Sequence, residues 1–138
     1  MIHSRKLEDL HPKVKTLAEQ FIAACDKAGI DVLIYSTYRD AESQNALYAQ
    51  GRTAKGSIVT NAKGGQSFHN WRVAFDFVPI VNGKAQWNDK AAYAKCGAIG
   101  EALGLQWAGR WAGKLKETAH MQYTGGLSLL DFQKGKTL

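Results

Sequence analysis

Three side chains of the types that bind catalytic zinc stand in two stretches that are far apart in the chain. His69 and Asp76 are seven positions apart, and His120 follows much later. Two imidazoles and one carboxylate are a known ligand set for catalytic zinc, and three protein ligands leave the fourth tetrahedral position open for water. Glu117, three residues before His120, is close enough to act as general base on such a water. These residues predict a metal-dependent hydrolytic site.

The spacing between His69 and Asp76 restricts the local structure. Side chains alternate along a strand, so an odd offset would put the two residues on opposite faces of one straight strand. A turn or bulge near residues 70–72 is therefore required if both are to reach one ion. Asp76 also lies in the apolar run 73–78, where an unpartnered carboxylate would be costly to bury. A metal ion would supply the missing partner.

A second interpretation of these residues needs no metal. A histidine near a strand is usually a packed or surface residue, and an aspartate beside it is often a turn former. The pair Glu117 and His120 favours the metal site, because the set then contains both ligands and a base.

Several elements are predicted around this set by periodicity and by capping residues. Apolar residues at three- and four-residue spacing predict a helix from Pro12 to Gly29, and β-branched residues predict a buried strand at 31–37. Asp40 is a good N-cap for a helix that ends at Gly51. Residues 51–66 show no periodic pattern, and we interpret them as a long active-site loop, the alternative being a plain connector.

The second half of the chain continues with a hairpin and a helix. Asn82-Gly83 between apolar segments is a strong hairpin signal. Asn88 or Asp89 can cap the next helix, which Gly104 ends. Its expected buried side is Ala92, Tyr93, Cys96, Ile99, Ala102 and Leu103. Residues 118–123 are expected to form the short strand that carries His120, and Ser128 to cap a brief last helix.

Length and composition restrict the class of protein. The chain has 138 residues, which suits one domain, 1–138, without a separate cell-wall-binding domain. No apolar run approaches the roughly 20 residues of a membrane span, and the N-terminus lacks the apolar core of a signal peptide. A net charge of +6 favours an anionic partner, but no basic run of five or more appears, which disfavours nucleic acid. Cys25 and Cys96 fall in helical patterns and are expected to be buried free thiols.

The ligand stretch resembles that of a known peptidase family. The pattern Ser67-x-His69-x-x-x-x-Ala74-x-Asp76, with an acidic residue shortly before a final His, looks like the zinc peptidases that cut cell-wall peptides containing D-amino acids. These include D-Ala-D-Ala carboxypeptidases and the L-alanyl-D-glutamate endopeptidases used as phage endolysins. Tyr38-Arg39 with Gln44, and the runs 47–53 and 103–107, look like the endolysin branch. The resemblance covers roughly residues 10 to 138.

The resemblance implies an α+β fold: a small, mostly antiparallel sheet with helices packed on one side and the zinc site at the sheet edge. It implies that His69, Asp76 and His120 hold Zn²⁺ and that Glu117 is the catalytic base. Arg72 stands where the family usually has glycine, so the close backbone packing that glycine permits must be achieved differently here.

The resemblance also suggests residues that contact the substrate. Arg39 is expected to face the substrate carbonyl or the tetrahedral oxyanion, although such an arginine is more often a surface or salt-bridging residue. Ser67 and Gln44 are candidates for orienting the substrate or supporting the ligands, the alternative being a loop hydroxyl and a helix-surface amide. Trp107 is a candidate substrate-binding residue. It and Trp111 suit either the core or the wall of a substrate groove.

The implied function is a peptidoglycan endopeptidase that cuts the L-Ala–D-Glu bond of stem peptides and acts as an endolysin in host lysis. We expect a monomer that is made in the host cytoplasm and reaches the periplasmic wall after the membrane is breached. One alternative is a D,D-carboxypeptidase that removes terminal D-Ala. The other is a non-catalytic wall-binding module that lost activity through changes such as Arg72.

Overall fold

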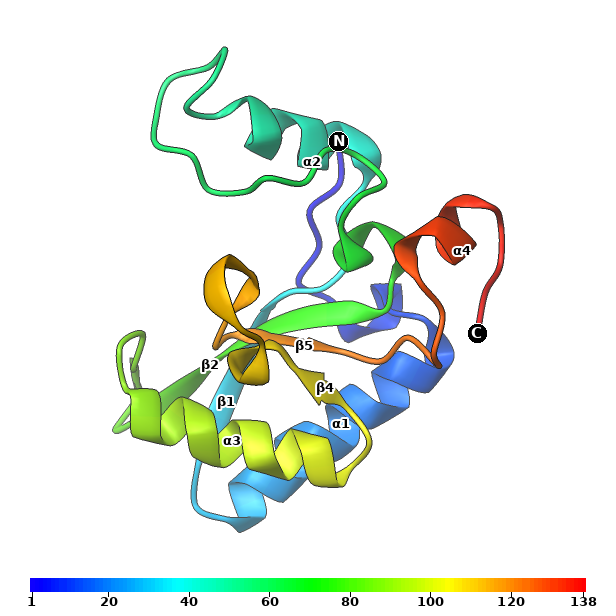
Figure 1. Cartoon of the computed structure of the whole chain (residues 1–138). Coiled ribbons are helices and arrows are strands. Elements are labelled where there is room, and N and C mark those ends of the chain that lie inside the picture. The colour runs from blue at the N-terminus through cyan, green and yellow to red at the C-terminus, as the bar shows by residue number, and fades with distance from the viewer.

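A small antiparallel sheet forms the centre of the molecule (Figure 1). The computed structural model describes residues 1–138, apart from the side chain of Lys114. The strands follow the order β1-β2-β5-β4, with β3 paired to β2 as a hairpin, and every pairing is antiparallel. The strands are β1 (Asp31–Ser36), β2 (Ala74–Val81), β3 (Lys84–Ala85), β4 (Gln106–Trp107) and β5 (His120–Gln122). The expected antiparallel α+β fold is confirmed.

Four α-helices accompany the sheet, and the longest two share one of its sides. The helices are α1 (Pro12–Lys27), α2 (Ala41–Ala49), α3 (Lys90–Ala102) and α4 (Leu129–Gln133). The side chains of Asp40 and Asp89 cap α2 and α3 by accepting a backbone N–H three residues on, as their positions predict. Figure 1 shows α1 and α3 together on one side of the sheet and α2 and α4 away from them. Among the described residues, no helix has both the length and the apolar character to span a membrane.

The core between the sheet and α1 fixes the direction in which Asp76 points. Phe75 and Phe77 of β2 pack on Phe21 of α1, with ring centroids 5.8 and 5.1 Å apart. Because side chains alternate along a strand, Asp76 between them points to the opposite face, which α1 and α3 leave open. Strands β2 and β5 are inner strands of the sheet. The candidate ligands on them therefore lie on the open face, and the expected position at a sheet edge is corrected.

The hairpin and the cysteines agree with expectation. Asn82 and Gly83 both have positive φ, 52° and 74°, as a tight turn between β2 and β3 requires. Cys25 and Cys96 are free thiols, both fully buried.

Trp107 is a core residue, and this corrects its expected role in substrate binding. Its indole fits against two glycines: a Cβ on Gly97 would lie 2.3 Å from the ring, and one on Gly109 would lie 2.1 Å from it. Its Nε1 donates a hydrogen bond of 2.8 Å to the carbonyl of Thr118. The close contact also explains why Gly97 is buried on α3. Ala102, expected on the buried side, is exposed, which corrects that expectation.

Candidate active site

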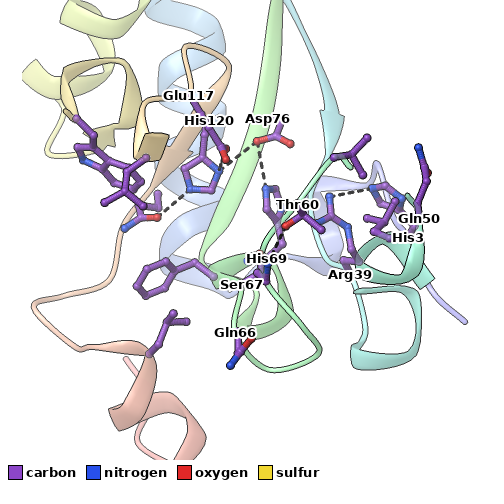
Figure 2. Close-up of a pocket in the computed structure, with 18 residues that line it drawn as sticks. His3, Arg39, Gln50, Thr60, Gln66, Ser67, His69, Asp76, Glu117 and His120 are labelled. Carbon is purple, nitrogen blue, oxygen red and sulfur yellow. Dashed lines mark hydrogen bonds and ion pairs between the residues drawn. The ribbon is translucent and has the colours of Figure 1, made fainter. Parts of the chain in front are cut away.

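His69, Asp76 and His120 meet at one point on the open face of the sheet (Figure 2). The Nε2 atom of His69 lies 3.1 Å from Oδ1 of Asp76, and Nδ1 of His120 lies 3.3 Å from the same oxygen. One donor atom from each residue falls within 4.8 Å of the others. His120 is directly opposite Asp76 in the ladder between β2 and β5, which places the two side chains on one face.

A short 3₁₀-helix, η2 (Phe68–Trp71), carries His69 and makes the turn that the spacing requires. The Oγ of Ser67 accepts a hydrogen bond of 3.3 Å from the backbone N–H of His69, and the Asn70 side chain accepts from the N–H of Ser67. The helix ends at Arg72, whose φ of 65° is left-handed. This reversal brings His69 and Asp76 to one side, as the predicted turn near residues 70–72 demands.

Arg72 occupies a backbone conformation that glycine adopts more easily, and two contacts hold it there. Its guanidinium lies over the ring of Tyr38, 3.8 Å from the ring centroid. Its Nη1 donates a hydrogen bond of 2.8 Å to the carbonyl of Asp9. The arginine thus offsets the backbone strain with side-chain contacts that glycine could not make.

We expect Arg72→Ala to be less stable than Arg72→Gly by about 1 kcal/mol, although at most positions alanine destabilises a folded chain less than glycine does. Both variants lose the contacts to Tyr38 and Asp9, but the alanine variant keeps the left-handed strain that glycine relieves. Urea unfolding followed by circular dichroism measures both free energies of unfolding. A glycine variant that is less stable than the alanine variant would show that the conformation at residue 72 carries no strain.

Outer hydrogen bonds decide which nitrogen of each histidine faces Asp76. A carbonyl oxygen can only accept, so Nδ1 of His69 donates to the carbonyl of Thr37 at 2.8 Å and leaves Nε2 free to ligate. The Nε2 of His120 lies 2.8 Å from Oε1 of Gln122, which leaves Nδ1 free on the side of Asp76. Imidazoles oriented in this way by outer partners are typical of metal sites. The donor set therefore fits a divalent metal ion.

The charges of the cluster support the same conclusion. Burial disfavours the ionised form of Asp76, but the two imidazoles outweigh burial and hold the pKa of that carboxyl well below its usual range. Burial also disfavours the charged form of His120, but the hydrogen bonds with Asp76 and Gln122 and the charges of Asp76 and Glu117 together outweigh burial and raise the pKa of the imidazole. The cluster is therefore a nearly buried carboxylate between two imidazoles, a setting that favours a positive charge at its centre.

Glu117 lies beside the cluster without joining it. Its Oε2 is 3.8 Å from Nδ1 of His120, and its side chain is 66% exposed. The backbone N–H of His120 donates to the carbonyl of Glu117 at 3.3 Å, so a tight turn keeps the two residues adjacent. An exposed carboxylate at this distance can take a proton from a water that reaches the cluster.

A cavity of about 670 Å³ opens over the cluster. Val59 and Thr60 from the loop 51–66 line one part of it, and Trp111 and Leu115 line another. The loop therefore borders the site, as expected. Of the two tryptophans, Trp111 lines the cavity, with its ring centroid 5.9 Å from that of His120.

Arg39 also lines the cavity, and Gln44 positions it. Nη1 of Arg39 donates a hydrogen bond of 2.8 Å to Oε1 of Gln44, and Nε2 of Gln44 donates 2.8 Å to the carbonyl of Ala62. Gln44 is 1% exposed. Its amide therefore orients Arg39 and anchors the loop 51–66 through the carbonyl of Ala62. Ser67, by contrast, lines the cavity while it caps η2.

Two residues at the site were not found from the sequence. His3, which no sequence pattern linked to the ligand stretch, is exposed at the surface and lines the cavity beside Arg39 (Figure 2). Gln122 orients His120 and in turn donates 2.9 Å to Oε1 of Gln106. The contact between His3 and Arg39 spans 36 positions, so no local pattern could have shown it.

Comparison with known proteins identifies relatives of the whole domain. Residues 7–126 match the VanY family, described as D-alanyl-D-alanine carboxypeptidase. The chain is 39% identical over 123 residues to the peptidoglycan L-alanyl-D-glutamate endopeptidase CwlK of Bacillus subtilis (strain 168), covering 83% of this chain and 73% of that protein. It is 28% identical over 128 residues to the L-alanyl-D-glutamate peptidase of Listeria phage A118, covering 88% of this chain and 41% of the phage protein.

The fold is also that of a solved VanY structure. A vancomycin-resistance D,D-pentapeptidase VanY, described in complex with Zn(II), superposes with a TM-score of 0.62 at 16% identity, over 90% of this chain and 83% of that chain. At such low identity, the superposition establishes a shared fold and nothing more. The family match and the similarity to CwlK extend over most of the sequence. The chain therefore belongs to the family of VanY-type D-alanyl-D-alanine carboxypeptidases and peptidoglycan L-alanyl-D-glutamate endopeptidases.

Proposed function

We propose that this protein is a zinc-dependent endopeptidase that hydrolyses the L-Ala–D-Glu bond of peptidoglycan stem peptides. The observation that carries the proposal is the convergence of His69, Asp76 and His120 beneath one cavity, with Glu117 at its side. The chain is also 39% identical to an endopeptidase named for that bond. The VanY structure described with Zn(II) supports zinc as the metal.

Each residue of the site has a role that follows from its position. His69 through Nε2, His120 through Nδ1 and the Asp76 carboxylate would hold the ion. When bound, zinc acts as a Lewis acid that lowers the pKa of water and polarises a carbonyl. Glu117 takes the proton of the attacking water and passes it to the leaving amine. Arg39 donates N–H bonds to the oxyanion that forms at the scissile carbonyl.

The bond that is cut can be identified from digestion products. We expect purified peptidoglycan treated with the zinc-loaded protein to show new amino termini on D-glutamate, with L-alanine left on the muramyl lactyl group. Mass spectrometry of the released fragments measures this, and the Glu117→Gln protein is the matched control. Release of free D-alanine without new glutamate amino termini would instead support the D,D-carboxypeptidase that the family description allows.

We further propose that the enzyme acts as a phage-type endolysin, reaching the wall from the host cytoplasm after the inner membrane is breached. The similarity to the Listeria phage peptidase supports this role. Lysis of an expressing culture should then require membrane permeabilisation. A culture that lyses at the same rate with an intact membrane would contradict the proposed route.

A further inference from the structure

The active-site cavity continues past Asp76 into a smaller hollow of about 250 Å³. Six residues line it: His3, Arg5, Tyr35, Ser36, Arg39 and Asp76. Three of these, His3, Arg39 and Asp76, also line the main cavity, so the hollow adjoins the metal cluster directly. Neither Arg5 nor Tyr35 has a role in the mechanism described above.

The N-terminal segment holds His3 and Arg5 in this position by pairing with the chain that follows β1. The backbone N–H of Ser4 donates 2.7 Å to the carbonyl of Tyr38, and the N–H of Thr37 donates 2.9 Å to the carbonyl of Ser4. Side chains alternate along such an extended segment, so His3 and Arg5 point to one side while Ser4 is buried on the other. These backbone hydrogen bonds fix the segment that carries both lining residues, and the Arg5 side chain on it is exposed to an incoming ligand.

The residues that line the hollow supply positive charge and hydrogen-bond donors, chiefly through Arg5 and Arg39. Among the side chains that the structure describes, neither Arg5 nor Arg39 forms an ion pair. Arg39 is partly buried, and burial lowers the pKa of its guanidinium despite the nearby Asp76. Its Nη2 lies 3.4 Å from Nε2 of His3 and 3.3 Å from Oγ of Ser36. A partly desolvated cation without an anionic partner is best satisfied by a carboxylate, through charge-assisted hydrogen bonds.

We propose that this hollow binds a carboxylate of the substrate, namely the free α-carboxylate of the D-glutamyl residue, with Arg5 as a specificity-determining residue. The inference rests on the proposed function. In the stem peptide, D-glutamate continues through its γ-carboxyl group, so its α-carboxylate is free. That carboxylate is attached to the Cα atom of D-glutamate, which also bears the nitrogen of the bond to be cut. Asp76 is a candidate zinc ligand, so the bond to be cut would lie beside it. The hollow that Asp76 borders is therefore where the α-carboxylate of D-glutamate would lie.

Two acetylated tripeptides test the proposal: N-acetyl-L-alanyl-γ-D-glutamyl-L-lysine and its D-isoglutaminyl counterpart, which differ in a carboxylate against a carboxamide. The zinc-loaded Glu117→Gln protein avoids turnover, and calorimetry measures the dissociation constants. We expect the carboxylate peptide to bind about tenfold more tightly than the amide, because hydrogen bonds to an ionised group are stronger. Adding Arg5→Ala should weaken binding of the carboxylate peptide about tenfold and leave the amide peptide unchanged.

Lys6→Ala is the matched control, because it removes one positive charge from the same segment without touching the hollow. Arg5→Lys should retain part of the preference, since lysine keeps the charge but not the fork of donors. Equal affinity for the two peptides would overturn the proposal. So would an Arg5→Ala effect that is the same on both peptides, or one matched by Lys6→Ala.

The digestion products separate this proposal from the proposed function. Fragments without new D-glutamate amino termini would refute the endopeptidase assignment. Correct fragments together with no preference for the carboxylate peptide would refute the carboxylate-binding role alone.

Discussion

Replacing Glu117 by glutamine is expected to lower the turnover number about 10²- to 10⁴-fold, the usual contribution of a positioned general base. This corresponds to about 3–5 kcal/mol of lost transition-state stabilisation. Glutamine has nearly the same shape but cannot accept the proton of the attacking water. Because Glu117 lies 3.8 Å from His120 and is 66% exposed, the fold and the zinc affinity should stay close to those of the parent.

Turnover on a defined stem peptide and zinc affinity by competition with a chromophoric chelator measure the two effects separately. Glu19→Gln is the matched control, because it makes the same substitution on α1, which lies on the far side of the sheet. Loss of zinc together with activity would make Glu117 a ligand and not the base. Full activity would move the base to another residue.

Replacing Asp76 by asparagine is expected to abolish activity by removing the metal. Substitution of an outer partner typically costs a metal site about 10- to 100-fold in affinity, and loss of a direct ligand should cost more. The neutral amide also leaves Nε2 of His69 and Nδ1 of His120 without the carboxylate that they now share. Chelation of the parent protein should have the same effect, and added zinc should restore activity to the parent but not to the variant.

Zinc content after dialysis, chelator competition and turnover are the measurements. Asp26→Asn, which changes a carboxylate at the end of α1, is the matched control. A metal-free parent protein that keeps full activity would contradict the metallopeptidase mechanism. A variant that keeps its zinc would remove Asp76 from the ligand set.

The candidate ligand residues and the local elements were predictable because each depends on residue type or on neighbours in the chain. The odd spacing of His69 and Asp76 required a turn, and the structure makes it with η2 and a left-handed Arg72. The caps at Asp40 and Asp89 and the hairpin at Asn82-Gly83 also depend on bonds and dihedral angles within about four residues.

The environment of those residues was decided only by tertiary structure. The pairing of β2 with β5 puts Asp76 opposite His120 on the open face of inner strands, whereas the family resemblance led us to expect the site at the sheet edge. Trp107 and Trp111 have the same chemistry and lie in the same loop region before Glu117. The close approach of Gly97 and Gly109 sends Trp107 into the core and leaves Trp111 at the cavity.

The sequence by itself determined which side chains could bind a metal, because that depends on residue type. It also determined the turn between His69 and Asp76, because hydrogen bonds within a few residues form it. Only the folded chain determined which nitrogen of His69 faces Asp76, since the deciding carbonyl belongs to Thr37, 32 positions away. The same holds for His3 beside Arg39, 36 positions away. Contacts over such separations depend on which strands pair and which faces pack, and no local pattern of residues encodes them.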